Sequence, residues 1–125
     1  APGPPPEAAP VDLATFRRAM REAGAEEAVD AILELFIEQA PLRMAALTEA
    51  IRAGDAVAIG RAAHTFRSPS GSIGAHRLEL LLKDIEDAAN AGDLVRAGPV
   101  FDRVEPEVEA VLRQLRLERQ GEPAP

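Results

Sequence analysis

Residues 62–75 have the sequence AAHTFRSPSGSIGA, and the rest of the chain is organised around this stretch. It contains His64, one of only two histidines among the 125 residues, and Arg67 follows three positions later. The alanines and Phe66 have helical spacing, whereas the small residues beyond them run on to a glycine–alanine pair at Gly74. The stretch therefore predicts a helix that carries one histidine and is followed by a turn into the next helix.

The composition favours an aliphatic, helical core. Hydrophobic residues make up 46% of the chain, but aromatic residues make up only 3%, and Trp and Tyr are absent. Ala, Leu, Glu and Arg have high helix propensity. At 125 residues the chain is long enough for one domain with a real core. It contains no cysteine, which excludes a disulfide framework and any thiolate nucleophile or metal ligand.

The charge and hydropathy of the chain exclude two classes of partner. The formal net charge is -7, whereas a general nucleic-acid binder needs the opposite sign to neutralise phosphates. The chain has no apolar run of the roughly 20 residues that a membrane-spanning helix needs, and no signal-peptide pattern. We therefore expect neither nucleic-acid binding nor direct membrane insertion.

Helix start and stop signals divide the middle of the chain into five segments. Asp12 is a predicted N-cap, and Gly54-Asp55 and Gly92-Asp93 each combine a helix stop with a fresh cap. No stretch shows sustained alternation of period two. The expected helices cover approximately residues 12–23, 25–53, 56–70, 75–91 and 94–119. The predicted fold class is all-α, an antiparallel up-and-down four-helix bundle with an extra short N-terminal helix.

Prolines should disturb the second and the last of these helices. Pro41 lies inside the second helix and should kink it, because its ring clashes with the carbonyl four residues earlier. Gly98-Pro99 and Pro106 should make the last helix irregular or split near its start.

Both ends of the chain have linker-like composition. Residues 1–10 contain five of the eleven prolines and predict a Pro-rich linker or tail, and residues 120–125 predict a C-terminal tail. The helical bundle is therefore expected over residues 11–119. Linkers on both sides favour a module attached to a larger protein, and the alternative is that both ends are simply disordered termini.

His64 is predicted to point away from the core of its helix. At ~100° per residue, Ile59, Ala62, Ala63 and Phe66 cluster on one side, and His64 lies roughly 140° from Ile59. The residues that share its face are Val57, Gly60, Arg61, Arg67 and Ser68. His64 should therefore project from the bundle between two guanidinium groups, with small residues leaving room beside it.

The residues around His64 favour one kind of chemistry over two others. A metal site needs several ligands, and the other histidine, His76, is expected on the outward face of the next helix. General-base catalysis needs a nucleophile, a pocket and an orienting carboxylate, none of which the sequence indicates. Capture of a phosphoryl group fits better, because neutral imidazole is a good nucleophile and Arg67 could bind phosphoryl oxygens.

The segment resembles the active helix of histidine-containing phosphotransfer (HPt) domains. Their pattern is His-x-x-Lys/Arg-Gly-Ser-Ser/Ala with a later Gly-Ala pair, and here it corresponds to residues 64–70 with Gly74-Ala75 following. The helix order over residues 12–118 is also similar, including an Ala-Gly-Asp connection at residues 91–93.

The resemblance implies a phosphorelay intermediate. His64 would accept a phosphoryl group from the aspartate of one receiver domain and pass it to another, and Arg67 would stabilise that group. Gly60, Arg61 and Ser68 would form the docking surface for the partner. Such domains have no cofactor and no kinase activity of their own, and the chain has no Gly-rich phosphate loop or other ATP or Mg²⁺ motif.

The expected partners are response-regulator receiver domains, and a histidine kinase in the same chain is a further candidate. We expect the isolated domain to be a monomer, located in the cytoplasm alone or as the cytoplasmic portion of a membrane-bound hybrid sensor kinase. Two alternatives stay open. One is a substrate domain of a chemotaxis-type histidine kinase, phosphorylated directly by an ATP-binding domain, and the other is a helical adaptor without chemistry.

The sequence departs from the family pattern at two adjacent positions. The family glycine is replaced by Ser68, which should allow a partner to approach, but less closely. Pro69 follows, removes an N–H group, and should bend the helix or end it early. Both changes bear on transfer rate and partner choice more than on the fold.

Other polar residues have weaker predictions. Gln39 and Arg43 are candidates to reach the imidazole or its phosphoryl group from the second helix, and the alternative is that they are ordinary exposed residues. His76 and the acidic runs at residues 26–27 and 84–87 are expected to be solvated. Ser70 and Ser72 are expected to cap the turn and the fourth helix.

Overall fold

The structure is a computed structural model that describes residues 9–119. Residues 1–8 of the linker expected at residues 1–10, and the whole tail expected at residues 120–125, lie outside the described residues. In the described part the helices are α1 (Leu13–Glu22), the 3₁₀ turn η2 (Glu26–Ala28), α2 (Val29–Ala53), α3 (Ala56–Ser72), α4 (His76–Asn90) and α5 (Leu94–Arg119). Each lies close to a segment that the sequence predicts.

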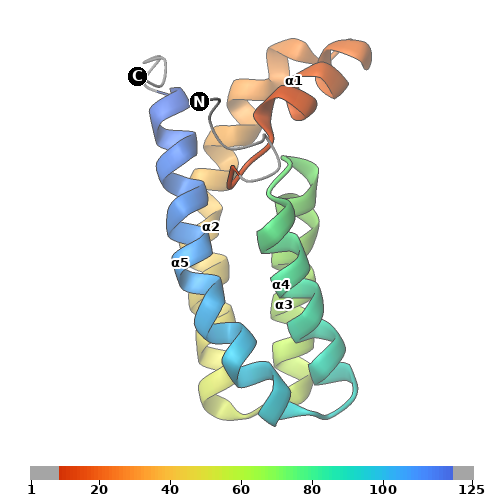
Figure 1. The fold of residues 1–125 in the computed structure, drawn as a ribbon, viewed down its shortest axis with the longest axis vertical. Coiled ribbons are helices and arrows are strands. Elements are labelled where there is room, and N and C mark those ends of the chain that lie inside the picture. Colours follow the sequence, from red (N-terminus) through yellow and green to blue (C-terminus); the bar gives the residue numbers. More distant parts are fainter. Residues whose placement is uncertain (1–8, 120–125) are drawn as a thin grey trace, which may run out of the picture.

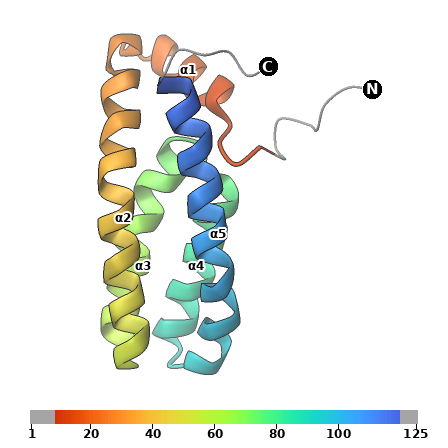
Figure 2. The same cartoon turned by 90° about the vertical axis from the view of Figure 1, so that its left-hand side faces the viewer.

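The four long helices α2–α5 run alternately up and down, and α1 lies across one end of the bundle (Figures 1 and 2). This confirms the predicted all-α four-helix bundle with a short N-terminal helix. Within residues 9–119, no helix is both long and apolar enough to cross a membrane. The same residues contain no group of three or more His, Cys, Asp or Glu side chains that could hold a metal ion.

Prolines disturb the helices less than their sequence positions predict. The split expected in the last helix is wrong, because α5 runs unbroken through Pro99 and Pro106. Pro69 does not end α3 early either, since the helix continues to Ser72. Each proline removes one intrahelical hydrogen bond, and the burial of a whole helix face offsets that cost. Helix α2 also continues through Pro41, and the kink expected there stays a prediction.

Aspartate caps begin α1 and α3, as the sequence predicts. The Asp12 carboxylate accepts hydrogen bonds from the Thr15 hydroxyl at 2.8 Å and the Thr15 N–H at 3.2 Å. These bonds hold the pKa of Asp12 below its usual range, so its charge and its cap persist to lower pH. At α3, Asp55 accepts from the Ala58 N–H at 3.2 Å, after Gly54 ends α2 in the left-handed conformation.

The caps predicted for Ser70 and Ser72 are wrong. Their hydroxyls donate back to the carbonyls four residues earlier, at Phe66 (2.8 Å) and Ser68 (3.0 Å). Because α3 extends to Ser72, both serines lie inside the last turns of a helix instead of beyond its end.

The turn between α3 and α4 needs glycine for two reasons. Gly74 has a φ of +91°, which side chains disfavour, and a Cβ there would lie 2.9 Å from the carbonyl oxygen of Asp12. The Asp12 N–H also donates to the Gly74 carbonyl at 3.0 Å. The segment that enters α1 is therefore bound directly to this turn.

The turn sets the register of α3 against α4. Gly60 faces Asn90, His64 bonds to Glu86, and Gly71 faces Glu79. In each pair the two residues are equally distant from Ala75, by 15, 11 and 4 positions respectively. An antiparallel hairpin with a short turn requires this symmetry, so the residues that meet across the two helices follow from the position of the turn.

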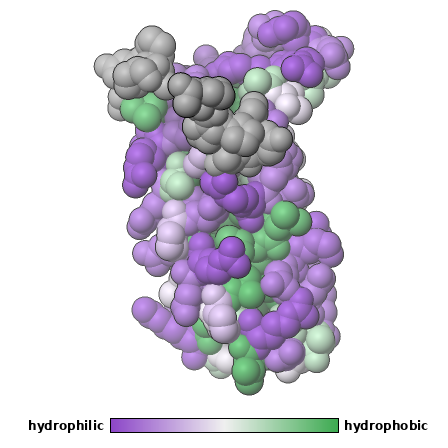
Figure 3. All heavy atoms as spheres, viewed as in Figure 1, coloured by the Kyte–Doolittle hydropathy of each residue, from purple (hydrophilic) through white to green (hydrophobic). Residues whose placement is uncertain are grey.

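The core fills the bundle with aliphatic side chains and a pair of aromatic rings. Phe36 of α2 and Phe66 of α3 pack with their ring centroids 6.2 Å apart, and Phe66 is completely buried. The other large side chains with full burial include Leu33, Leu47, Ile59, Ile73, Leu78, Leu82, Ile85 and Leu115. On the outside, the view in Figure 3 is mainly hydrophilic, with apolar side chains gathered over its lower half.

Phe66→Ala should destabilise the bundle by about 3–5 kcal/mol, because it empties the space beside Phe36 and the surrounding helices cannot close it fully. Urea unfolding followed by circular dichroism measures this change. The control is Val57→Ala in the same helix, where the side chain is 65% exposed and a change within about 0.5 kcal/mol is expected. Equal midpoints for the two variants would contradict the placement of Phe66.

Candidate functional site around His64

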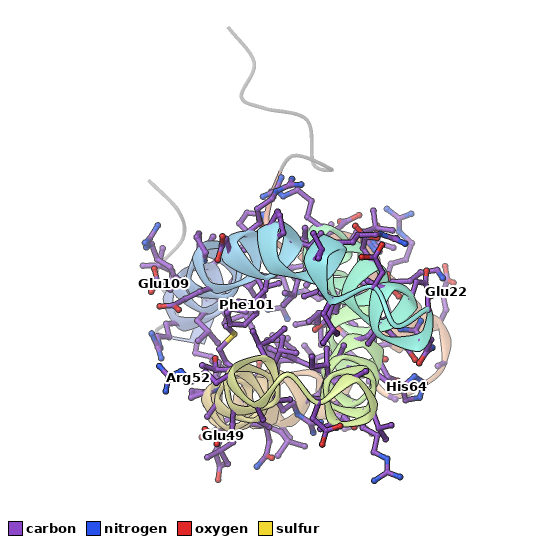
Figure 4. All side chains as sticks on the ribbon, turned by 90° about the horizontal axis from the view of Figure 1, so that it is seen from below. Glu22, Glu49, Arg52, His64, Phe101 and Glu109 are labelled. Atoms are coloured by element: carbon purple, nitrogen blue, oxygen red, sulfur yellow. The ribbon has the colours of Figure 1, made fainter. Side chains whose placement is uncertain are left out.

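His64 projects outward from α3, as its position on the helix predicts. Ile59, Ala63 and Phe66 of the same helix are buried, whereas the His64 side chain is 62% exposed. In Figure 4, which looks along the bundle from one end, the imidazole lies at the outside of the molecule. A partner can therefore reach this ring without any rearrangement of the core.

A carboxylate on the neighbouring helix holds the imidazole. The Oε2 atom of Glu86 in α4 lies 2.8 Å from Nδ1 of His64, and Oε1 accepts a hydrogen bond of 2.9 Å from Nε of Arg67. The Glu86 side chain is only 16% exposed, so this bridge is formed at the edge of the core. Both oxygens of one carboxylate are therefore used to fix the two residues of the sequence motif.

This bridge determines which ring nitrogen carries the proton. An ionised carboxylate only accepts hydrogen bonds, so the Nδ1 atom of His64 must be the donor to Glu86. Nη2 of Arg67 also lies 3.4 Å from Nδ1, but a protonated Nδ1 cannot accept from it, and this approach is a contact only. The lone pair of the neutral ring is then on Nε2, at the opposite side of the imidazole.

His64 borders a shallow groove of about 490 Å³ between α3 and α4. Its walls come from both helices and are mostly small, with Val57 as an exposed apolar side chain at 65% exposure. The lining residues are Ala56, Val57, Gly60, Arg61, His64, Thr65, Glu86, Ala89 and Asn90. The groove is open, so it suits contact with another macromolecule better than enclosure of a small ligand.

The three residues predicted to dock a partner differ in accessibility. Arg61 and Ser68 are exposed on α3, as expected. Gly60 is instead buried, because it faces α4: a Cβ at this position would lie 3.2 Å from Oδ1 of Asn90. Its lack of a side chain brings α4 close to the His64 turn, and the open space expected at Gly60 is absent.

Gln39 and Arg43 line a second groove, of about 790 Å³, between α2 and α3. Arg43 reaches α3, but its Nη1 atom donates to the backbone carbonyl of Thr65 at 3.0 Å instead of to the imidazole. Arg61 and Thr65 border both grooves. They therefore lie between the groove against α2 and the groove beside His64. His76 is 58% exposed, in agreement with its prediction as a solvated residue.

The sequence analysis missed Glu86. It assigned residues 84–87 to a solvated face and found no orienting carboxylate, and both interpretations are wrong for Glu86. One signal was present: Glu86 lies four residues after Leu82 and three before Ala89, at the edge of the buried stripe of α4. The symmetry of the hairpin about Ala75 then places Glu86 opposite His64.

Comparison with known proteins agrees with this site. The Hpt domain family model matches residues 31–117, which is well over half of the chain. The crystal structure of histidine-containing phosphotransfer protein B (HptB) from Pseudomonas aeruginosa PAO1 is similar, with a TM-score of 0.79 and 29% sequence identity. The match covers 87% of this chain and 94% of that chain. A search of curated protein sequences finds no significant match.

The chain belongs to the Hpt domain family. It is a histidine phosphotransfer carrier of two-component phosphorelays, as the resemblance around His64 implied. Domains of this family carry phosphoryl groups without being catalysts in themselves, and they interact with response-regulator receiver domains.

Glu86→Ala should redistribute the proton between the two nitrogens of His64. A hydrogen bond to a charged group contributes about 1.5–3 kcal/mol, and the low end applies at this largely exposed ring, so the tautomer ratio should change about tenfold. Imidazole ¹⁵N chemical shifts measure the ratio directly. Asp87→Ala is the control, because that neighbouring carboxylate bonds to Lys83 at 3.2 Å instead. Unchanged ¹⁵N shifts in Glu86→Ala would contradict the bridge.

Proposed function

We propose that this domain is a phosphorelay intermediate that accepts a phosphoryl group on Nε2 of His64 from a receiver aspartate and passes it to a second receiver. The observation that carries the proposal is the pairing of an exposed imidazole with a largely buried carboxylate at its Nδ1 atom. This arrangement leaves the nucleophilic nitrogen on the side of the ring that a partner can approach.

The transfer step needs no net proton movement. The Nε2 lone pair of neutral His64 forms the N–P bond, and the electrons of the breaking P–O bond leave with the aspartate carboxylate of the donor. The ring acquires a positive charge while its Nδ1 proton stays in place. Transfer to the second receiver reverses these changes, with a carboxylate oxygen as the nucleophile.

Glu86 favours the forward step through electrostatics. Its carboxylate accepts the Nδ1 proton at 2.8 Å, so a fixed negative charge faces the positive charge that the ring acquires. The same hydrogen bond orients the imidazole and leaves Nε2 unprotonated. This is how a carboxylate behind a histidine supports nucleophilic and general-base chemistry elsewhere, without itself taking the proton.

The direct partner of Arg67 in the structure is the Glu86 carboxylate. Its Nε donates to Oε1 of Glu86 at 2.9 Å, which places the guanidinium on the Nδ1 side of His64. The guanidinium keeps Glu86 in position and is 30% exposed. Stabilisation of the phosphoryl group, the role that the motif implies for Arg67, would require its terminal nitrogens to turn towards the Nε2 side.

The partner surface that we propose is the groove beside His64. The apolar Val57 and the exposed cation of Arg61 border it, while the molecule as a whole has a formal net charge of -7. A local cation of this kind suits the acidic phosphoacceptor site of a receiver and favours encounter in the correct orientation. Ser68, one turn beyond His64 on the same helix, would border the contact at its edge.

Phosphoryl transfer from a labelled receiver tests the proposal. Wild-type protein should acquire acid-labile label, His64→Gln should acquire none, and Arg67→Ala should be labelled about tenfold more slowly through loss of one charge-assisted hydrogen bond. Helicity by circular dichroism should not change in either variant. His76→Gln is the matched control and should be labelled like the wild type, because His76 lies outside the site.

Two other outcomes would replace the proposal. Label from an ATP-binding kinase domain, with none from a panel of phosphorylated receivers, would assign the domain to direct phosphorylation in a chemotaxis-type kinase. Receiver binding without any label would favour an adaptor. Incubation of the isolated domain with ATP should leave it unlabelled, since we propose no kinase activity of its own.

The assembly and setting of the domain are also proposals. We propose that the isolated domain is a monomer, which light scattering can measure, and that it works in the cytoplasm, where receivers are available. A histidine kinase in the same polypeptide is the further partner that fits the Pro-rich composition of residues 1–10.

A further inference from the structure

Pro69 removes a hydrogen bond from the helical turn that carries His64. In an α-helix the N–H of residue 69 would donate to the carbonyl of Thr65, and proline has no N–H. Thr65 is the neighbour of His64 in the sequence, so the missing bond lies directly beside the phosphoacceptor. Helix α3 nevertheless continues without a break to Ser72.

A side chain from another helix occupies the acceptor that Pro69 leaves. Nη1 of Arg43 in α2 donates to the Thr65 carbonyl oxygen at 3.0 Å. Arg43 and Pro69 also line the same small cavity, of about 180 Å³, so the guanidinium lies on the proline side of α3. A charged donor forms a stronger hydrogen bond than the peptide N–H that it replaces.

We propose that Arg43 is a positioning residue that substitutes for the hydrogen bond lost at Pro69 and thereby holds the His64 turn of α3 in place. The turn is then fixed from two sides, by Arg43 of α2 at the Thr65 carbonyl and by Glu86 of α4 at the imidazole. The consequence for phosphoryl transfer rests on the proposed function, whereas the hydrogen bond itself does not.

The consequence for His64 follows from geometry. The imidazole keeps its hydrogen bond to Glu86 only while the backbone of α3 stays in register with α4, and the 2.8 Å distance leaves little tolerance. A turn that lacks one of its own hydrogen bonds is easier to deform. Loss of Arg43 should therefore weaken both the helix and the orientation of the phosphoacceptor.

A double-mutant cycle between Arg43 and Pro69 tests the proposal. Arg43→Met keeps an unbranched apolar side chain and removes its donors, and Pro69→Ala restores the peptide N–H. In the Pro69 protein, Arg43→Met should raise the unfolding equilibrium constant and lower the rate of His64 labelling, each about fivefold to tenfold. In the Pro69→Ala background both effects should shrink below about twofold, because Thr65 then has an intrahelical donor.

The cycle isolates the pair, because Pro69→Ala has the same effect on the unfolded chain with and without Arg43→Met, and this effect cancels. Arg43→Lys should recover part of the loss, since it keeps a cationic donor of similar reach. Arg52→Met, on the same helix, is the matched control and should show no dependence on Pro69. Equal effects of Arg43→Met in both backgrounds, or no effect in either, would overturn the proposal.

A spectroscopic measurement separates this proposal from the proposed function. The ¹³C shift of the Thr65 carbonyl should move in Arg43→Met and return towards the wild-type value in the double variant. This result, with the stability coupling, would support the role of Arg43 in the turn even if no receiver labels the protein. A Thr65 shift that does not respond to Arg43→Met would overturn it even if labelling proceeds.

Discussion

The turn at Gly74 is the constraint on which the site depends. Its positive φ and the close approach of the Asp12 backbone both require glycine, and the turn sets the register between α3 and α4. A slip of one residue would move each side chain about 100° around its helix and 1.5 Å along it. Glu86 would then no longer face the imidazole, although both helices could still bury most of their apolar surface.

The chemistry that we propose for the domain depends on a contrast in burial between His64 and Glu86, which lie within hydrogen-bond distance of each other. His64 is exposed and Glu86 is nearly buried, so the ring is available to a partner while its orienting charge is protected from competing water. Arg67 occupies the second oxygen of Glu86, which compensates the cost of placing a carboxylate at the edge of an aliphatic core. In the proposed function the domain needs no enclosed pocket around His64, because the docked receiver would enclose the imidazole from the open side of the groove.

The region after His64 shows how tertiary structure compensates a local defect. Pro69 interrupts the hydrogen-bond ladder of α3, and helix propensity alone predicts an early end there. The helix continues because Phe66 and Ser70 are buried against the bundle and because Arg43 supplies a donor to the Thr65 carbonyl. The same reasoning applies to α5, where burial of Val104 and Val108 offsets two interior prolines.

The sequence by itself determined the helices, most of their ends, the outward direction of His64 and the resemblance to the family, because periodicity, caps and glycine stops are local properties. It could not determine the partners of His64 and Thr65, since Glu86 and Arg43 are each 22 residues away from them and come from different helices. Helical spacing places many other charged side chains outside the core in the same way, so it does not distinguish Glu86 and Arg43 from them. Only the packing of α2 and α4 against α3 decided which two of them reach the His64 turn, because that choice depends on helix register and on distances of about 3 Å.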